Sequence, residues 1–442
     1  KNKVKIFQPD LIALSTTEDM WLLGTRLLEE VEEFILRHKI PVIAGGVFPT
    51  FAPELVINHR LMDMVCIGEG ENAMIDLCER LDKGQGYRDV TNLWIKQKNG
   101  EIVKNPISNP FEINDTPMID IELFEEQRLY RPMAGEWYKM MPVETIRGCP
   151  YKCTFCNSPD QIALYNDQAG ANFFRKKSIN LVYQELKHFK NKYGVEYNYF
   201  WADTFLSWNN QEFDEFCEMY SEIKLPFWMQ TRPETLTDYK VKRLAEIGLH
   251  RISFGIEHGN EAFRRKLLNR DWKNGPIIEA LKIPVKYDIA FSVNNITGFP
   301  TETRNLAMHT VELNRHIKSH NQNLYSFVPF HGTPLRKKCE ELGLVNPETI
   351  TKALTDKPML YQEQYTPDEI EGLQKCFVFY VNMPKNRWKD IERAEKNTTE
   401  GRKIFNELKI EYMDKYARSS NVIPENESSH IADLEYGIEY TG

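Results

Sequence analysis

Three cysteines stand close together in the middle of the chain, at Cys149, Cys153 and Cys156, in a C-x3-C-x2-C pattern. This spacing places three soft thiolate ligands on one short loop, and no fourth Cys or His lies nearby. A structural zinc site needs four protein ligands, whereas a four-iron cubane held by three cysteines keeps one iron open. The pattern therefore favours an iron–sulfur cluster that can bind a substrate over a structural zinc site or three unrelated buried thiols.

The other five cysteines form no such pattern. Cys66, Cys78, Cys217, Cys339 and Cys376 each stand among apolar neighbours and are far apart in the sequence. Eight cysteines in 442 residues do not make a secreted disulfide framework. We therefore expect these five to be small buried hydrophobic residues.

The region from residue 142 to about 345 must position the cysteine loop, and it alternates strand-like and helix-like stretches. Strands are expected at residues 143–146, 197–201, 227–230, 251–255, 290–295 and 324–328, and helices at 180–193, 211–223, 237–247, 261–268 and 275–287. This alternation predicts a partial (β/α)6 barrel with its functional residues at the carboxyl ends of the strands. The cysteine loop follows the first strand, and Asp203, Arg232 and Glu257 stand at the ends of the next three. The aromatic residues Trp201, Trp208, Tyr325 and Phe330 near strand ends either line a substrate pocket or belong to the barrel core.

The amino-terminal region has its own alternation, with apolar runs at residues 11–15, 41–46 and 64–68 and helical spacing over 22–37. This βαβαβ order predicts a doubly wound layer with a parallel sheet, in which ligands bind at the carboxyl ends of the strands. The residues at those ends are Ser15, Thr16, Gly45, Gly46, Gly68, Glu69, Gly70 and Glu71. Their glycines either let the backbone approach a large ligand or only make tight turns, and spacing alone does not decide between the two.

The cysteine loop, with Phe155 directly before its last cysteine, resembles the signature of radical S-adenosylmethionine (SAM) enzymes. Segments 253–259, 298–303 and 332–335 and Arg270 are similar to the same family, and the likeness covers roughly residues 8–345. It implies a [4Fe–4S] cluster on Cys149, Cys153 and Cys156, and SAM as a second cofactor.

The same resemblance implies roles in binding SAM for the strand-end residues and for Phe155 on the loop. A carboxylate suits the amino group of a bound methionine, a guanidinium suits its carboxylate, and a second carboxylate suits ribose hydroxyls. These roles are expected for Asp203, Arg232 and Glu257, respectively. No catalytic proton acceptor is assigned.

Residues 45–50, which include Thr50, followed by Asp63 and residues 68–71, resemble the cobalamin-binding domain of the B12-dependent branch of this family. Phe48 stands where many members have His, and no D-x-H-x-x-G segment is present. Any cobalamin is therefore expected to bind without a histidine from that motif. Residues 3–7 also join residues 8–11 directly, although a first strand, helix and second strand need about 30 residues, so we expect this domain to be incomplete in the sequence.

The resulting domain prediction has three regions. Residues 1–125 form a Rossmann-like cobalamin-binding domain with a linker, residues 126–345 a radical SAM partial TIM barrel, and residues 346–442 a helical region. The linker contains a predicted hairpin of residues 93–96 and 101–103 around Asn99-Gly100.

Composition narrows the class of protein and its partners. The chain is 41% hydrophobic and 27% charged, which excludes disorder for most of its length. Lys and Arg total 56 against 64 Asp and Glu, a net charge of −8, so no global positive field attracts nucleic acid. No apolar run approaches the roughly 18 residues of a membrane span, and the first ten residues lack a signal-peptide core. The cytoplasm is the expected compartment.

The leading functional prediction is an enzyme that cleaves SAM to a 5′-deoxyadenosyl radical and methylates an unactivated carbon through methylcobalamin. A radical SAM cyclase, or a ring-rearranging or oxidising enzyme with cobalamin and no methyl transfer, is the main alternative. A non-catalytic iron–sulfur carrier or cobalamin-binding sensor is the alternative from another class. The expected partners are a small-molecule or natural-product substrate and an electron donor such as a flavodoxin or ferredoxin, without nucleic acid.

Overall fold

The computed structural model describes residues 1–352 and 356–417. The chain divides into two compact units, each built from separate stretches of sequence. Unit 1 comprises residues 1–112, 154–173 and 328–359, and unit 2 comprises residues 113–153, 174–327 and 360–442. The units are interleaved in sequence, and the predicted division into three consecutive domains stays a prediction.

Unit 1 is built on a five-stranded sheet in the order β1-β2-β3-β4-β5. Strands β1 (Ile12–Ser15), β2 (Val42–Gly45) and β3 (Met64–Cys66) are parallel, with Ser15 opposite Gly45 and Ala44 opposite Val65. Strands β4 (Leu93–Lys96) and β5 (Ile102–Lys104) are antiparallel and form the predicted hairpin. The parallel strands place their carboxyl ends along one edge of the sheet.

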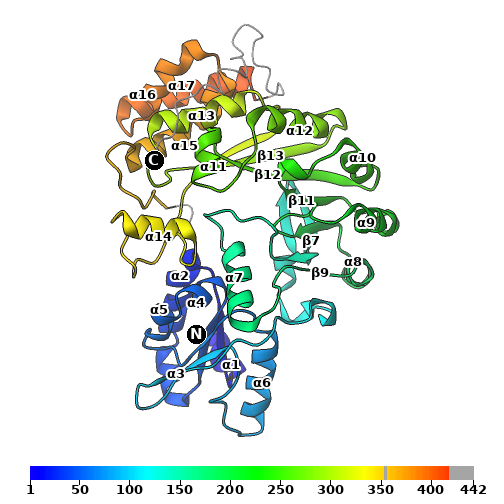
Figure 1. The fold of residues 1–442 in the computed structure, drawn as a ribbon, viewed down its shortest axis with the longest axis vertical. Helices are drawn as coiled ribbons and strands as arrows, with labels where there is room; N and C mark the ends of the chain where they lie inside the picture. The colour runs from blue at the N-terminus through cyan, green and yellow to red at the C-terminus, as the bar shows by residue number, and fades with distance from the viewer. Residues whose placement is uncertain (353–355, 418–442) are drawn as a thin grey trace. The chain divides into compact units, whose positions relative to one another are not determined.

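Helices cover both faces of this sheet because its central strands are apolar on both sides. Helices α2 (Glu18–Glu29), α3 (Glu32–His38), α4 (Val47–Phe51) and α5 (Pro53–Ile57) pack on the face that carries Val42 and Ala44. Helix α6 (Glu71–Asp82) packs with Ile43 on the opposite face, and α1 (Asn2–Phe7) precedes β1. Figure 1 shows α6 on the other side of the sheet from α3 and α5. The strand order within the described part of unit 1 is sequential.

The single helix expected over residues 22–37 is wrong, because α2 and α3 are separate helices. Val31 has φ −115° and ψ 9°, outside the helical region. Glu29 and Glu30 lie at the end of α2, where negative charges oppose the helix dipole, and a β-branched residue follows them.

Unit 2 contains a seven-stranded sheet in the order β14-β13-β12-β11-β10-β7-β6, the curled sheet of a half-barrel. Its parallel strands are β7 (Glu136–Glu144), β10 (Tyr197–Trp201), β11 (Phe227–Thr231), β12 (Leu249–Glu257), β13 (Ala290–Thr297) and β14 (Asn321–Ser326). Strand β6 (Tyr130–Met133) pairs antiparallel with β7 at one edge, which the sequence did not predict. The predicted α/β partial barrel is thus confirmed as a half-barrel sheet.

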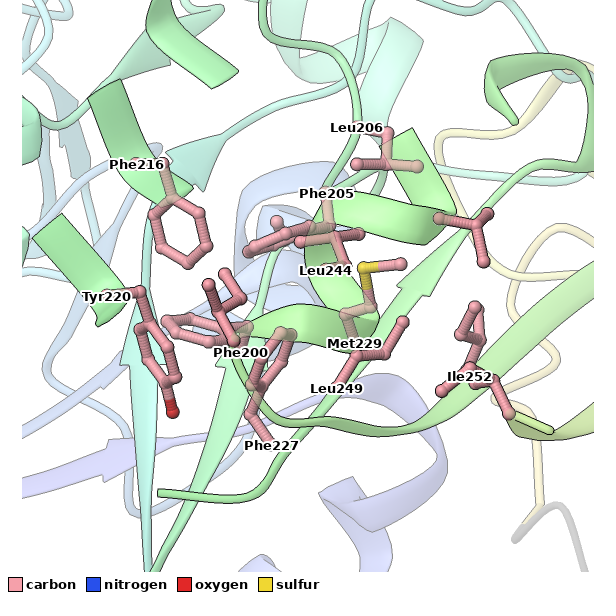
Figure 2. Packing of buried hydrophobic residues seen from close by; sticks show 14 of the residues in the cluster. Phe200, Phe205, Leu206, Phe216, Tyr220, Phe227, Met229, Leu244, Leu249 and Ile252 are labelled. Carbon is pink, nitrogen blue, oxygen red and sulfur yellow. The ribbon is translucent and has the colours of Figure 1, made fainter. Parts of the chain in front are cut away.

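One face of the half-barrel packs on helices α8 (Ile179–Tyr193), α9 (Asn210–Ile223), α10 (Asp238–Glu246) and α12 (Asn274–Lys286). The core between them is rich in aromatic rings, and Phe200 contacts Phe205, Phe216 and Phe227 with ring centroids 5.0–5.5 Å apart (Figure 2). Burial of this apolar surface is the main stabilising contribution to unit 2. The short helix α11 (Glu261–Lys266) follows β12.

The region after the half-barrel is helical, as expected. Helices α15 (Pro367–Asn382), α16 (Trp388–Glu395) and α17 (Thr399–Lys415) share a buried cluster with α13 (Arg304–Arg315), which lies between β13 and β14. The cluster includes Val311, Leu373 and Leu408. Thr366 and Glu369 form a capping box at the start of α15. Residues 418–442 of the predicted helical region lie outside the described residues.

Two helices from later in the sequence belong to unit 1: α7 (Ser158–Ala169) and α14 (Pro334–Glu341). The buried carboxylate of Glu18 on α2 fixes the segments on both sides of α14, since it accepts hydrogen bonds from the backbone N–H groups of His331 before the helix (2.8 Å) and Thr351 after it (2.9 Å). Among the helices of residues 1–352 and 356–417, none is long and apolar enough to cross a bilayer.

Candidate functional site

The cysteine loop begins after the two-residue strand β8 (Ile146–Arg147), at the carboxyl end of β7. Cys149 lies in unit 2, and its Sγ is 3.5 Å from the hydroxyl oxygen of Thr204. Burial raises the pKa of the Cys149 thiol, while the Thr204 hydroxyl and the Arg232 charge oppose this increase. Thr204 is thus a polar neighbour of the first cysteine that sequence reasoning missed, although it directly follows Asp203.

Cys153 is the last loop residue in unit 2, and Arg232 reaches it. The Nη1 of Arg232 donates a hydrogen bond to the Cys153 Sγ at 3.5 Å, and the guanidinium lies 3.7 Å from the ring centroid of Tyr151. Burial raises the pKa of the Cys153 thiol, and the charges of Arg270 and Arg232 counteract it. A cationic side chain beside a thiol stabilises the thiolate that a metal requires.

Arg232 and Glu257 belong to one buried chain of alternating charges that also contains Glu234 and Arg270. Arg232 pairs with Glu234 through Nε at 3.1 Å, and Glu234 lies 4.0 Å from Arg270. Arg270 donates to Glu257 Oε1 at 2.6 Å and to the carbonyl of Gly255 at 2.8 Å. Sequence reasoning missed Glu234 entirely and gave Arg270 no role.

Glu257 ends β12 in an unusual backbone conformation, with φ +72°, and is 8% exposed. Burial raises the pKa of its carboxyl group, whereas the charges of Arg270 and Arg232 lower it. Asp203, by contrast, is exposed after β10, and its charge raises the pKa of Cys149. The structure thus brings Asp203 and Arg232 close to cysteines and holds Glu257 rigidly on the neighbouring strand.

Cys156 and Phe155 lie in unit 1, in the turn before α7. The Cys156 Sγ accepts a hydrogen bond from the N–H of Ser158 at 3.5 Å. The carbonyl of Thr154 accepts from Leu335 at 3.0 Å, and Phe155 is half-buried. The turn is therefore fastened within unit 1 on the carboxyl side of Cys153.

The donor set of the loop fits an iron–sulfur cluster, because all three residues are thiols and each has a polar neighbour. Among the residues that the structure describes, no three His, Cys, Asp or Glu side chains already converge as a metal site. Each cysteine sulfur instead contacts its own partner: Thr204, Arg232 or the N–H of Ser158. The assignment of these ligands remains a prediction.

The predicted ligand edge of unit 1 is formed by tight turns at the ends of β1 and β2. The Thr16 N–H donates to the Gly45 carbonyl at 3.0 Å, and the Thr50 hydroxyl to the Gly46 carbonyl at 2.8 Å. Gly46 has φ +111°, and a Cβ there would lie 2.6 Å from the Thr16 carbonyl oxygen. Ser15 is exposed at the same edge. Gly46 is thus required by the packing of the chain on itself.

The turn after β3, residues 68–71, is held from two sides. The Thr50 hydroxyl accepts from the Gly68 N–H at 3.0 Å, and the Tyr165 hydroxyl accepts from the Glu69 N–H at 2.7 Å. Gly68 has φ +75°, and a Cβ there would lie 2.4 Å from the Tyr165 oxygen. Tyr165 is 1% exposed and lies on α7, the helix that follows Cys156. Sequence reasoning missed it.

The remaining residues of this turn, Gly70 and Glu71, are half-buried at the start of α6. The Glu69 carboxylate accepts from the N–H of Phe111 at 2.8 Å. The turns along the edge are thus held by bonds within unit 1, and their assignment to cobalamin stays a prediction.

Phe48 does not occupy a ligand position at this edge. It is 2% exposed, and its ring contacts Trp21 (5.5 Å between centroids) and His331 (5.6 Å). His331 is itself engaged, with Nδ1 2.8 Å from Glu18 and Nε2 2.9 Å from the Pro347 carbonyl. Both rings are therefore engaged within unit 1.

Comparisons with known proteins indicate the same class of enzyme as the cysteine loop. Residues 143–313 match the family model described as the radical SAM superfamily. An uncharacterized methyltransferase of Pyrococcus horikoshii is 25% identical over 396 residues, 88% of this chain and 82% of that protein. The anaerobic magnesium-protoporphyrin IX monomethyl ester cyclase of Rubrivivax gelatinosus is 23% identical over 353 residues, 78% of this chain and 60% of the cyclase.

The fold also has a solved counterpart. The cobalamin-dependent SAM radical enzyme OxsB, with aqua-cobalamin and SAM bound, superposes with a TM-score of 0.63 at 16% identity. The match covers 93% of this chain and 64% of the OxsB chain. Residues 143–313 of the present chain thus match a radical SAM domain, in agreement with the class predicted from the cysteine loop. Enzymes of this class carry a [4Fe–4S] cluster and use SAM, in agreement with the predicted cofactors.

Proposed function

We propose that this enzyme is cobalamin-dependent and methylates an unactivated carbon of a small molecule, with a [4Fe–4S] cluster on Cys149, Cys153 and Cys156. The observation that carries the proposal is the cysteine loop at the carboxyl end of β7, together with Arg232 directed at the sulfur of Cys153. When bound, the cluster supplies the electron that cleaves SAM, and cobalamin supplies the methyl carrier.

The polar residues at the strand ends bind and orient SAM in this proposal. The exposed carboxylate of Asp203 takes the methionine amino group, and Arg232 takes its carboxylate. Glu257 takes the ribose hydroxyls, and its hydrogen bond from Arg270 fixes the side chain before SAM arrives. Such fixed positions lower the entropic cost of bringing the reacting groups together. Phe155 supports the loop beside the cluster.

Cobalamin would be held at the carboxyl edge of the unit 1 sheet. Ser15, Thr16, Gly45, Gly46 and Thr50 provide hydroxyl and backbone groups there, and the turn of residues 68–71 provides the rest. Tyr165 and Thr50 keep that turn in place through their bonds to Glu69 and Gly68. The proposal includes a cobalamin-binding Rossmann-like domain at residues 1–125, a radical SAM barrel at 126–345 and a helical region at 346–442.

The proposed partners are a small-molecule or natural-product substrate and a reduced flavodoxin or ferredoxin. The net charge of −8 supports the proposal that nucleic acid is not a partner. The cytoplasm, where thiols stay reduced, is the proposed compartment because the cluster needs free cysteines.

Methyl transfer is tested with SAM that carries a deuterated methyl group. The reconstituted enzyme is incubated anaerobically with this SAM, reduced cobalamin and a chemical reductant, and the products are separated by mass spectrometry. The proposal predicts 5′-deoxyadenosine together with cobalamin that has gained the deuterated methyl group. Formation of 5′-deoxyadenosine without labelled cobalamin would reject methyl transfer and favour the cyclase alternative, which the similarity to the Rubrivivax cyclase supports.

A further inference from the structure

The half-barrel sheet of unit 2 has a second face, which we call the inner face. Side chains alternate along a strand, and Phe200, Met229, Phe254 and Val293 point to the helix-covered core. Their neighbours in sequence therefore point to the inner face. Those residues are Tyr199, Trp201, Trp228, Gln230, Arg251, Ser253, Gly255, Ser292 and Asn294, with Asn323 and Tyr325 on β14.

Four aromatic side chains lie on the inner face, and two of them carry a polar group that makes no hydrogen bond within the described residues. Tyr199 stacks on Trp228 with centroids 4.1 Å apart and an interplanar angle of 6°, and Trp201 lies 6.1 Å from Tyr199. Trp201 is 60% exposed, and Tyr325 at the other side of the face is 45% exposed. Trp208, in contrast, is 4% exposed in the core. Within the described ranges, neither the Tyr199 hydroxyl nor the Trp228 N–H has a hydrogen-bond partner, although both rings are half-buried.

A ladder of uncharged polar side chains crosses the other half of the inner face. Asn323 donates to Asn294 Oδ1 at 2.9 Å, and Asn294 donates to the Ser253 hydroxyl at 2.8 Å. Ser292 adds a bond to the same hydroxyl at 3.3 Å. On β11, Gln230 donates to the Ala202 carbonyl at 3.1 Å, which leaves its amide oxygen available. The ladder is pre-ordered and can accept or donate hydrogen bonds along one edge of a ligand.

Two cations flank the aromatic pair. Arg251 lies opposite Trp228 in the β11–β12 register, and Arg131 lies opposite Tyr138, whose ring contacts Tyr197 on the inner face. The Arg131 charge also lowers the pKa of Tyr199, although burial raises it more strongly. Neither arginine has an ion-pair partner in the part of the chain that the structure describes. Arg251 and Arg131 thus place two positive charges on the strands beside the aromatic pair, in a protein whose net charge is −8.

The inner face also lies within reach of the residues assigned to SAM. Trp201 precedes Asp203 by two positions, Gln230 precedes Arg232 by two, and Gly255 precedes Glu257 by two. A strand rises about 3.3 Å per residue, so each pair is separated by roughly 7 Å along its strand. A molecule on the inner face would therefore present its carbon atoms near the carboxyl ends of β10, β11 and β12.

We propose that the inner face is the substrate subsite and that its substrate is a planar conjugated carboxylic acid. Trp201, Tyr199 and Trp228 contact its ring system, Asn294 and the ladder bind its polar edge, and Arg251 pairs with the carboxylate. This assignment rests on the proposed function, since it names the substrate class of the same enzyme. It explains why large aromatic side chains remain exposed beside unpaired arginines.

The test measures binding and does not need turnover. Enzyme reconstituted with iron, cobalamin and SAM is dialysed to equilibrium against naphthalene-2-carboxylate or its uncharged analogue, naphthalene-2-carboxamide. The carboxylate should bind about tenfold more tightly than the amide, because a charged hydrogen bond adds to the ring contact. Trp201→Ala should weaken carboxylate binding about fivefold or more. Arg251→Gln should remove the preference for the carboxylate.

Trp137 on β7 is the matched control, since it is 69% exposed but alternates with Tyr138 onto the opposite face. Trp137→Ala should leave the affinity for the carboxylate unchanged. Trp201→Phe should keep most of the affinity that Trp201→Ala loses. Equal affinity for the two probes, absence of binding, or equal loss in the Trp137 and Trp201 variants would overturn the assignment. SAM cleavage in the same preparations is the separate readout of the proposed function, so the two proposals can fail independently.

Discussion

The pair of Glu257 and Arg270 provides a quantitative prediction. Both side chains are buried, with 11% and 6% of their surface exposed, and Arg270 donates to Glu257 at 2.6 Å. Replacing Arg270 with Met keeps most of the side-chain volume but removes the charge that compensates Glu257. The carboxyl group must then remain as an unpaired buried charge or take up a proton.

Protonation of Glu257 sets an upper limit on how much Arg270→Met lowers the free energy of unfolding. From the reference pKa of 4.5, protonating a glutamate at pH 7 costs about 3.4 kcal/mol, because each pKa unit is worth about 1.4 kcal/mol. Loss of the hydrogen bond to the Gly255 carbonyl adds about 1 kcal/mol, so the destabilisation at pH 7 is at most about 4.4 kcal/mol. This upper limit corresponds to a melting temperature lower by roughly 9–18 °C.

The assay is thermal unfolding followed by circular dichroism at several pH values. The folded-state pKa of Glu257 is raised above its unfolded value by burial, so the cost to stability appears as pH rises above the unfolded pKa. The deficit of Arg270→Met should therefore shrink from pH 7 to pH 5. Arg265→Met, at an exposed position on α11, should change stability by less than about 0.5 kcal/mol.

A double variant completes the test. Adding Glu257→Gln to Arg270→Met removes the unpaired charge and should recover part of the lost stability. If Arg270→Met melts at the same temperature as Arg265→Met, or if its deficit does not depend on pH, the buried pair is not coupled as described.

Three further predictions concern the loop and its surroundings. Cys153→Ala should abolish the iron–sulfur absorbance and SAM cleavage, whereas Cys78→Ala on the exposed side of α6 should retain both; a Cys153 variant with a full cluster would remove this ligand. Asp160 has a buried Oδ2 without a hydrogen-bond partner, and burial raises the pKa of its carboxyl group to about 6. Asp160→Asn should thus raise the free energy of unfolding above pH 6, by on the order of 1 kcal/mol for a half-exposed group, and this gain, measured by thermal unfolding, should vanish toward pH 4. Tyr165→Phe should weaken cobalamin binding about fivefold through the lost bond to Glu69 while the cluster absorbance stays unchanged; equal affinity would exclude a role for Tyr165 in shaping the turn.

Most of the parallel strands and the class of enzyme were readable from the sequence because they depend on local patterns, whereas β6 was not. The apolar runs at residues 11–15, 41–46 and 64–68 correspond to β1, β2 and β3 within one or two residues at each end. The hairpin of β4 and β5 followed from Asn99-Gly100. The cysteine loop is contiguous, so its spacing alone indicated its chemistry.

The partners of the site residues were not readable, because they come from distant parts of the sequence. Tyr165 bonds to Glu69 across 96 positions, and Arg270 reaches Glu257 only after the chain passes through α11. The sequence also could not show that the glycine at position 68 accommodates Tyr165. Helix α7, which carries Tyr165, has only weak amphipathic spacing and was missed.

The central claim is that one chain binds a [4Fe–4S] cluster and cobalamin together. The most direct measurement is anaerobic purification with iron and cobalamin supplied, followed by metal analysis and a visible spectrum. The account predicts about four irons and one cobalt per chain. Iron without cobalt would contradict the methyltransferase proposal, and absence of iron would contradict the assignment of the cysteine loop.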